Sequence, residues 1–137
     1  MRRTYLLLSL TLVVGIAMGV IADRVLIAGG DVKRAELIRQ DLPGIEGKQV
    51  IVFFSDIGPG LVLSKHYHPG HEFVYVVEGN GILEAEGKTP LRVKKGDVFY
   101  QPPNQKHRFK NASQTERVKN LVFLIAEEGK PFAIEVK

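Results

Sequence analysis

The sequence predicts a single all-β domain of the sandwich or barrel type. Beyond residue 31 the apolar runs are short, about five residues each, which is a typical strand length. Gly, Pro and Asn residues separate these runs at close intervals, as they do in turns between strands. The chain has 137 residues, which is room for one domain, and it shows no tandem repeat.

Seven apolar runs are expected to form strands, in the order of the chain. They comprise residues 50–54, 73–77, 82–86, 91–93, 98–100, 121–126 and 132–136. Turn residues follow most of them; Gly58-Pro59-Gly60, for example, closes the first run. Residues 34–42 stay undecided, because the adjacent Leu37 and Ile38 fit neither the alternation of a strand nor a long helix.

The first 22 residues are typical of a targeting segment. Arg2 and Arg3 precede 18 uncharged, mostly apolar residues that end at Ala22, the pattern of a secretory signal. As a helix these 18 residues would measure about 27 Å, close to the roughly 30 Å of a bilayer core, so a membrane anchor fits as well.

The domain organisation expected from this pattern has three parts. Residues 1–22 form an N-terminal hydrophobic helix that serves as a signal peptide or a membrane anchor, residues 23–33 a spacer, and residues 34–137 the functional domain. Arg2 and Arg3 would keep the N-terminus cytoplasmic and send the rest across the membrane. We therefore expect an exported protein, periplasmic or extracytoplasmic, that is either free or anchored to the inner membrane by residues 5–22.

The composition excludes several classes of function. Lys and Arg number 19 against 15 Asp and Glu, and only 17 basic residues remain when Arg2 and Arg3 are set aside. A domain so close to neutral gives no support to nucleic-acid binding. The absence of Cys excludes disulfides, Cys-ligated zinc and a thiolate nucleophile. We expect a small-molecule partner, with membrane contact only through the N-terminal segment.

All four histidines of the chain belong to one group of candidate metal ligands. His66 and His68 are two residues apart, so in a strand both imidazoles lie on the same face. Glu72 follows after the Pro69-Gly70 turn, and His107 can contribute from a different strand. Imidazoles with one carboxylate suit a divalent first-row metal that keeps open positions for water or substrate. His71 has the opposite parity to Glu72, so we expect it at the rim, or as an alternative ligand.

The spacing of these residues resembles the two motifs of the cupin superfamily. The first motif is matched at every interval by Gly60, His66-Tyr67-His68, Glu72 and Gly79. The second is matched by Gly96, Pro102-Pro103-Asn104, His107 and Asn111. In this second motif Asn104 stands where cupins have glycine, and Asn is the other residue that best tolerates a left-handed turn.

The resemblance, which extends to small single-domain exported bacterial cupins of type 2, implies a fold and a metal site. The fold would be a cupin-type jelly-roll β-barrel of about eight strands. The metal ligands would be His66, His68, Glu72 and His107, with one divalent ion per chain. Such ligands accept Fe, Mn, Ni, Cu or Zn, so the sequence does not name the metal.

Two functions of different class follow from the resemblance. In the first, the protein is a mononuclear metal-dependent dioxygenase that acts on a small phenolic or enol compound, with Glu72 as the catalytic base. In the alternative, it is a non-catalytic cupin that binds or senses a small molecule and uses the metal as an anchor. A metal-free structural role is disfavoured, because all four ligand positions are intact.

Other residues are expected around the site and at an interface. Val74 and Val76 share the parity of Glu72 and would line the cavity, with Phe99, Gln101 and Phe109 as further neighbours. A basic cluster would form a solvated rim or attract an anionic substrate; it comprises Lys94, Lys95, Lys106, Arg108 and Lys110. Residues 73–77 and 121–125 are apolar at both parities, which predicts covered faces and a two-fold homodimer.

Overall fold

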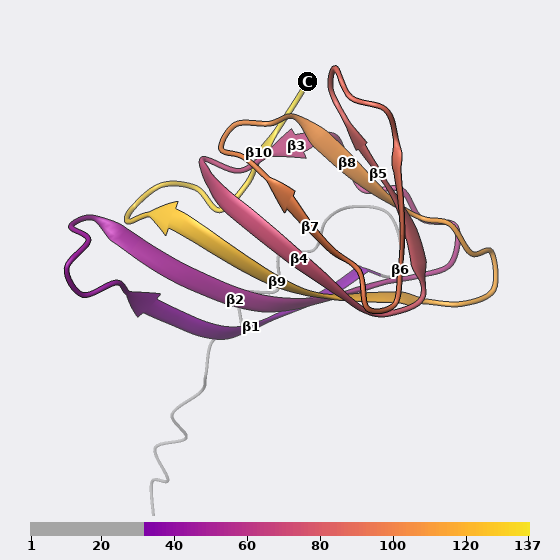
Figure 1. The fold of residues 1–137 in the computed structure, drawn as a ribbon, viewed down its shortest axis with the longest axis horizontal. Helices are drawn as coiled ribbons and strands as arrows, with labels where there is room; N and C mark the ends of the chain where they lie inside the picture. The colour runs from indigo at the N-terminus through magenta and orange to yellow at the C-terminus, as the bar shows by residue number, and fades with distance from the viewer. Residues whose placement is uncertain (1–31) are drawn as a thin grey trace, which may run out of the picture.

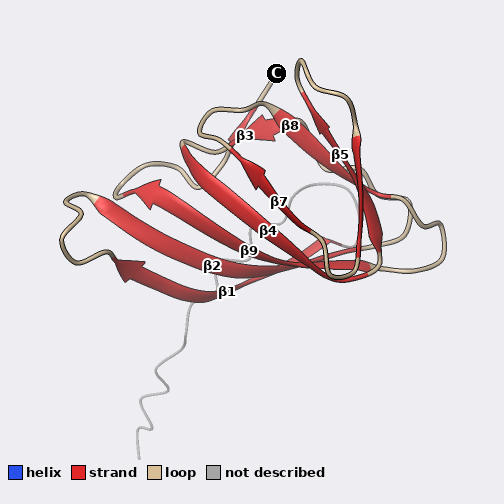
Figure 2. Cartoon of the chain, viewed as in Figure 1, coloured by secondary structure: helices blue, strands red, loops and turns tan. Residues whose placement is uncertain are grey.

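The computed structural model describes residues 32–137, which form two five-stranded antiparallel sheets and, within that range, no helix (Figures 1 and 2). The first sheet has the order β1 (Val32–Asp41), β2 (Lys48–Ile57), β9 (Val118–Glu127), β4 (Gly70–Glu78) and β7 (Val98–Gln101). The second has the order β10 (Ile134–Glu135), β3 (His66–Tyr67), β8 (His107–Asn111), β5 (Asn80–Ala85) and β6 (Leu91–Lys94).

The core lies between the inner faces of the two sheets, and alternation of buried and exposed residues along strands such as β4 builds it. On β4, Glu72, Val74 and Val76 are buried, while Phe73 and Tyr75 between them are exposed. The buried cluster includes Ile51, Ile57, Leu83, Phe109, Val118 and Leu124. The all-β prediction and its jelly-roll arrangement are confirmed.

The segment left undecided by the sequence is the edge strand β1. It pairs with β2 alone, and the register shifts between Glu36 and Ile38, as at a β-bulge. Leu37 has no register partner at this irregularity and Ile38 resumes the pairing; they are 56% and 54% exposed. The bulge explains why two adjacent apolar residues broke the alternation that a strand should show.

The structure supports the left-handed turn expected at Asn104. Its φ is +62°, and it is the non-glycine residue with positive φ among the described residues. The N–H of Asn104 donates a hydrogen bond of 2.8 Å to the carbonyl of His68. The turn before β8 is thereby tied to the segment that carries two of the candidate ligands.

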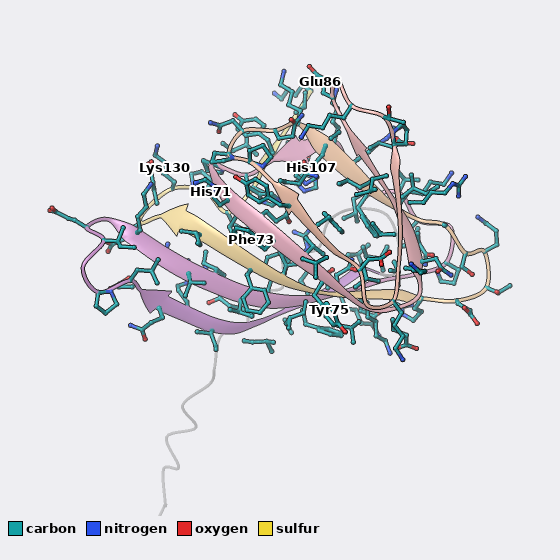
Figure 3. All side chains as sticks on the ribbon, viewed as in Figure 1. His71, Phe73, Tyr75, Glu86, His107 and Lys130 are labelled. Atoms are coloured by element: carbon teal, nitrogen blue, oxygen red, sulfur yellow. The ribbon has the colours of Figure 1, made fainter. Side chains whose placement is uncertain are left out.

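The outer face of the first sheet carries exposed aromatic side chains. His71, Phe73 and Tyr75 follow one another along β4 in Figure 3. Phe73 stacks on Tyr100 of β7, and Phe123 of β9 is its direct register partner. The Phe and Tyr residues of this face are each about two-fifths exposed, from 39% to 44%: Phe73, Tyr75, Tyr100 and Phe123. This surface is therefore apolar although it faces solvent in the single chain.

The N-terminal predictions fall mostly outside the described residues. The expected signal peptide or anchor over residues 1–22, with its helix, is not described, and it stays a prediction. The last two residues of the expected spacer, Val32 and Lys33, belong to β1. Within residues 32–137 no helix has the length and apolar character needed to cross a membrane.

Candidate metal centre

Three histidines from two parts of the chain meet inside the barrel. His66 lies on β3, His68 directly follows that strand, and His107 begins β8. His66 and His107 are direct partners in the antiparallel register of β3 and β8. All three side chains are buried, and their ligand nitrogens lie within 4.8 Å of one another. The strand pairing therefore brings together the residues that the two sequence motifs separate.

The main chain fixes the tautomer of each imidazole. The Nδ1 atoms of His66, His68 and His107 lie 2.7, 2.8 and 2.8 Å from main-chain carbonyl oxygens, those of Ser64, Phe132 and Gln105. A carbonyl oxygen only accepts hydrogen bonds, so each Nδ1 must carry the proton and donate it. Each Nε2 is then left with a lone pair, which is the form that binds metals.

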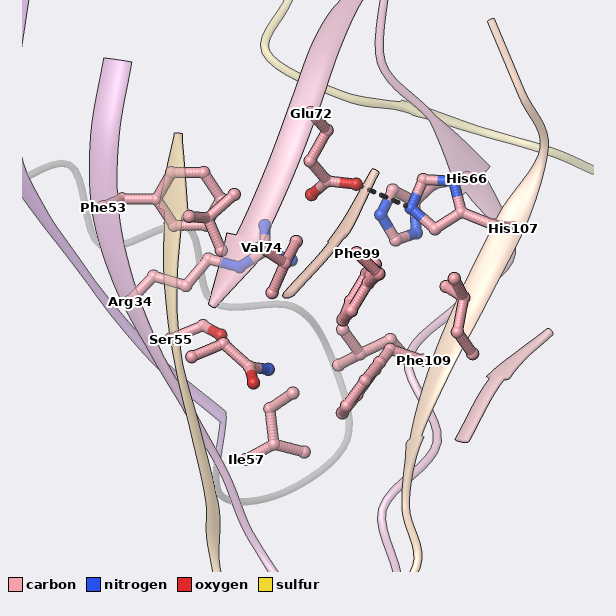
Figure 4. Close-up of a pocket in the computed structure, with 14 residues that line it drawn as sticks. Arg34, Phe53, Ser55, Ile57, His66, Glu72, Val74, Phe99, His107 and Phe109 are labelled. Carbon is pink, nitrogen blue, oxygen red and sulfur yellow. Dashed lines mark ion pairs between the residues drawn. The ribbon is translucent and has the colours of Figure 1, made fainter. Parts of the chain in front are cut away.

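The carboxylate of Glu72 adjoins two of these nitrogens. Its Oε1 lies 3.3 Å from the Nε2 of His68. Its Oε2 lies 3.3 Å from the Nε2 of His107, the contact that the dashed line in Figure 4 marks. Ligands about 2.1 Å from a shared ion in a tetrahedral arrangement lie roughly 3.4 Å apart. These two separations are therefore close to the separation of ligand atoms around one cation.

The environment of His68 supports the fit of a metal ion. Its Nε2 is buried and makes no hydrogen bond within the described part of the chain. A buried polar atom without a partner is rare and calls for a ligand. Three buried imidazoles are a suitable donor set for a divalent first-row ion. The three histidines are thus positioned to bind a metal, and their chemistry does not select its identity.

The protonation equilibria of the site follow from burial and charge. Burial lowers the pKa of His66 to about 4, so this imidazole is neutral near pH 7. Burial would raise the pKa of Glu72, but contacts with His107 and His68 outweigh it and hold that pKa well below its usual range. Burial would lower the pKa of His107, yet the contact with Glu72 raises it above the usual value.

A small cavity extends from this site into the barrel. Its free volume is about 40 Å³. One water molecule needs roughly 10 to 15 Å³ of such volume. His66, Glu72 and His107 line one part of it, and apolar side chains line most of the rest. Of the expected neighbours, Val74, Phe99 and Phe109 line the cavity, whereas Val76 and Gln101 are buried but do not contribute to its wall.

Three polar cavity residues were not anticipated from the sequence: Arg34, Ser55 and Asn120. Arg34 pairs with Ser55 across β1 and β2, and Ser55 pairs with Asn120 across β2 and β9. Directly paired residues share a face, so the three form one row on the inner side of the sheet. One sequence signal could have placed Arg34 in the cavity. Arg34 is two residues from the apolar Val32, so in a strand both side chains lie on the same face, but residues 34–42 had first to be recognised as a strand.

The other singled-out residues lie away from the cavity. The structure places His71 on the outer face of the first sheet, where its Nδ1 lies 2.8 Å from the Tyr100 hydroxyl. In the basic cluster, Lys94 pairs with Asp97 and Arg108 pairs with Glu84 at exposed positions. These cations are solvated and partly neutralised, which favours the rim interpretation.

Comparison with known families identifies the fold. The family model described as a cupin domain matches residues 53–124, more than half of the chain. The chain belongs to the cupin family. The matched stretch contains all four residues of the candidate site, and the expectation drawn from the two motifs is thereby confirmed for the family and the fold.

Relatives of this cupin include biosynthetic and uncharacterised proteins. Over 60 residues it is 45% identical to "Polyketide synthase CurC" of Streptomyces cyaneus, a match that covers 42% of this chain and 38% of that protein. The chain thus spans well under half the length of this curated relative. A cupin-like protein of Thermotoga maritima has a similar structure, with a TM-score of 0.61 and 28% identity over 79% of this chain and 77% of that one.

A second structural neighbour is the polyketide cyclase RemF of Streptomyces resistomycificus. Its TM-score is 0.60 and its identity 20%, over 77% of this cupin and 71% of that chain. At this identity the likeness concerns the fold.

Proposed function

We propose that this cupin is a mononuclear metal-dependent dioxygenase that acts on a small phenolic or enol compound, with dioxygen as co-substrate. The observation that carries the proposal is the set of three Nδ1–H groups held by main-chain carbonyls. This arrangement turns three buried Nε2 lone pairs toward one point before any ion arrives. Such preorganisation is expected of a metal site and serves no purpose in an apolar barrel.

Glu72 would complete the ligand set and handle the proton. We assign metal binding to His66, His68, His107 and Glu72, with one divalent ion per chain. The bound ion would supply Lewis-acid stabilisation of a substrate oxyanion and an open position for dioxygen. Glu72 is ionised at neutral pH because its pKa is held low, so it can accept the proton of a phenol or enol hydroxyl. The apolar wall of Val74, Phe99 and Phe109 excludes bulk water from that proton.

The similarity to a polyketide synthase supports an enolisable substrate. Polyketides carry repeated keto groups that enolise readily, and the matched segment of 60 residues is 45% identical. The activity of that whole protein does not transfer, since the match covers 38% of its length.

A second candidate is a non-catalytic binding or sensing cupin that uses the metal as an anchor. The low pKa of Glu72 favours it, because a carboxylate that ionises so readily is a weak proton acceptor. In that case Glu72 is one ligand among four and moves no proton.

The Glu72→Gln variant separates the two candidates. The protein is loaded in turn with Fe, Mn, Ni, Cu and Zn, its metal content is measured, and oxygen uptake is followed with a panel of small phenolic and enol compounds. For a dioxygenase, turnover by the fully metal-loaded variant should fall roughly 10²-fold or more. Glu78→Gln is the matched control, because Glu78 lies on the same strand but is exposed and paired with Lys119.

Two outcomes would contradict the dioxygenase proposal. Full turnover by the metal-loaded Glu72→Gln variant would remove Glu72 from the chemistry. Tight ligand binding without oxygen consumption, in every metal form, would establish the binding or sensing function instead.

A further inference from the structure

The inner face of the barrel holds a cation, Arg34, that forms no ion pair within the described residues 32–137. Arg34 is half-buried, and its Nε is sealed from solvent without a hydrogen bond within residues 32–137. Its guanidinium carbon lies 5.7 Å from the ring centre of Phe53 and 5.6 Å from that of Phe132. Arginine stays charged in proteins, and the rings compensate a buried charge only in part. The fold therefore tolerates a costly group that an anion would satisfy.

Glu72 is not that anion, although it is close enough for its charge to act on Arg34. The two side chains form no ion pair, because the carboxylate oxygens of Glu72 adjoin His68 and His107. Figure 4 shows Arg34 reaching from β1 into the cavity, toward Val74 and the space beside Glu72. A gap between a carboxylate and a guanidinium in one small cavity is a place where a ligand can bind both the metal site and Arg34.

A second polar group without a partner lines the same cavity. The Oδ1 of Asn120 is buried and makes no hydrogen bond among the described residues. Asn120 belongs to the row of Arg34, Ser55 and Asn120 that crosses three neighbouring strands of the inner face. One unsatisfied polar atom can be accidental, but two in one cavity indicate a ligand that is itself polar.

Phe132 links this row to the metal centre. Its ring packs edge-on against His68, with the ring centres 5.3 Å apart, and its carbonyl oxygen accepts the Nδ1–H of the same histidine. Arg34 lies against the same ring. Arg34 and a candidate metal ligand thus contact the same aromatic ring.

We infer that Arg34 is the specificity-determining residue of this cavity and that the ligand carries a carboxylate, bound by the guanidinium while its enol oxygen faces the metal site. The planar guanidinium matches a carboxylate through two parallel hydrogen bonds, and the Oδ1 of Asn120 can accept a hydrogen bond from a hydroxyl group of the same ligand. The cavity has room for about three waters, so a ligand that reaches both Arg34 and the metal site must be a small enol acid. The inference names the chemical class of the ligand. Only its statement about the oxygen that faces the metal site rests on the proposed function.

The test is a titration of the full-length protein, labelled with ¹⁵N-arginine, with acetate and with its neutral isostere acetamide. The Arg34 Nε–H signal is assigned by its loss in Arg34→Gln. Acetate should shift this signal in a saturable way and acetamide should not. Arg34→Gln should weaken acetate binding, measured by calorimetry, roughly 10-fold or more, the scale of a lost hydrogen bond between charged groups.

Control variants separate recognition from folding. Arg34→Lys keeps the charge without the two-pronged geometry, so it should bind acetate with intermediate affinity while retaining metal. Arg39→Gln removes a cation on the same strand that is paired with Glu36, and it should bind acetate like the wild-type protein. Equal binding of acetate and acetamide, or undiminished acetate binding by Arg34→Gln and Arg34→Lys, would overturn the inference.

The titration is run on metal-free and metal-loaded protein, so the two proposals fail separately. Loss of metal binding or of turnover in the wild-type protein would contradict the proposed function but leave the acetate shift at Arg34 intact. A metal-loaded, active protein whose acetate binding ignores Arg34 would contradict only the inference.

Discussion

His66 and His107 face each other as register partners on β3 and β8, and their ring centres lie 4.6 Å apart. Main-chain pairing, together with the hydrogen bonds from their Nδ1 atoms to carbonyl oxygens, holds them in place. The arrangement of the ligands thus derives from the strands and needs no ion to form. Metal binding and folding should be separable in this protein.

Replacing His66 or His107 with Ala should therefore abolish metal retention and leave the domain folded. Elemental analysis of the purified variants measures the metal, and circular dichroism checks the β-structure. His71→Ala is the control, since His71 lies on the outer face of the first sheet and should leave metal content unchanged. Undiminished metal in both of the first two variants would refute the assignment.

The metal-free protein should lose stability as the pH falls from about 6.5 to 4. The pKa of His66 is about 4 in the folded chain and near 6.5 when unfolded, so the unfolded state binds more protons across this window. The free energy of unfolding should decrease by about 3 kcal/mol through this residue. The raised pKa of His107 acts in the opposite direction, because its contribution is present at low pH and is lost as the pH rises through the folded value.

Urea unfolding of chelator-treated protein at a series of pH values measures how the free energy of unfolding changes with pH. The His66→Asn variant has no titrating group at this position, so its stability should depend less on pH between 6.5 and 4. An unchanged slope in this variant would mean that His66 does not titrate as described.

Asn111→Ala should destabilise the protein by about 2 to 4 kcal/mol. The side chain of Asn111 is fully buried, and its Nδ2 approaches three carbonyl oxygens, those of Ile57, Gly58 and Glu116, at 3.1, 2.9 and 2.8 Å. Its Oδ1 also accepts the N–H of Ser113. Truncation leaves these buried groups without partners. Denaturant unfolding measures the loss.

Gln114→Ala in the same loop is the control for Asn111, because Gln114 is exposed. It should change stability by no more than about 0.5 kcal/mol. A similar small effect at Asn111 would show that water replaces its hydrogen bonds.

The protein should form a two-fold homodimer through the aromatic outer face of the first sheet. Phe73, Tyr100 and Phe123 are partly exposed there, and a partner sheet would remove them from water. Sedimentation at micromolar concentration measures the assembly, and Phe123→Lys should shift it toward monomer. A wild-type protein that sediments only as monomer would contradict this prediction.

A strand and a turn within the two motifs could be predicted because both are encoded locally. The run of residues 73–77 and the turn at Asn104 needed only alternation and the left-handed preference of Asn. Glu72 and His107 could be assigned to one site because their intervals match a family pattern, whereas their 3.3 Å contact comes from the folding of separate strands.

Arg34 could not be placed in the same way. The β-bulge between Glu36 and Ile38 breaks the alternation that would have identified β1. Its position in the cavity also depends on the non-local pairing of Arg34 with Ser55 and of Ser55 with Asn120, which no local pattern encodes. Residues of this kind are found only when the sheet order is known.

The carbonyl groups that orient the three histidines have a consequence for the divergence of the sequence. Every amino acid has a main-chain carbonyl, so the acceptors at Ser64 and Gln105 persist through any substitution that keeps the backbone in place. Proline at position 105 is the exception, because the N–H of Gln105 donates to the carbonyl of Pro102. Other substitutions at these two sites should leave the orientation of the ligands unchanged. A mutational scan of the chain should find positions 64 and 105 permissive although they adjoin the most constrained residues of the protein.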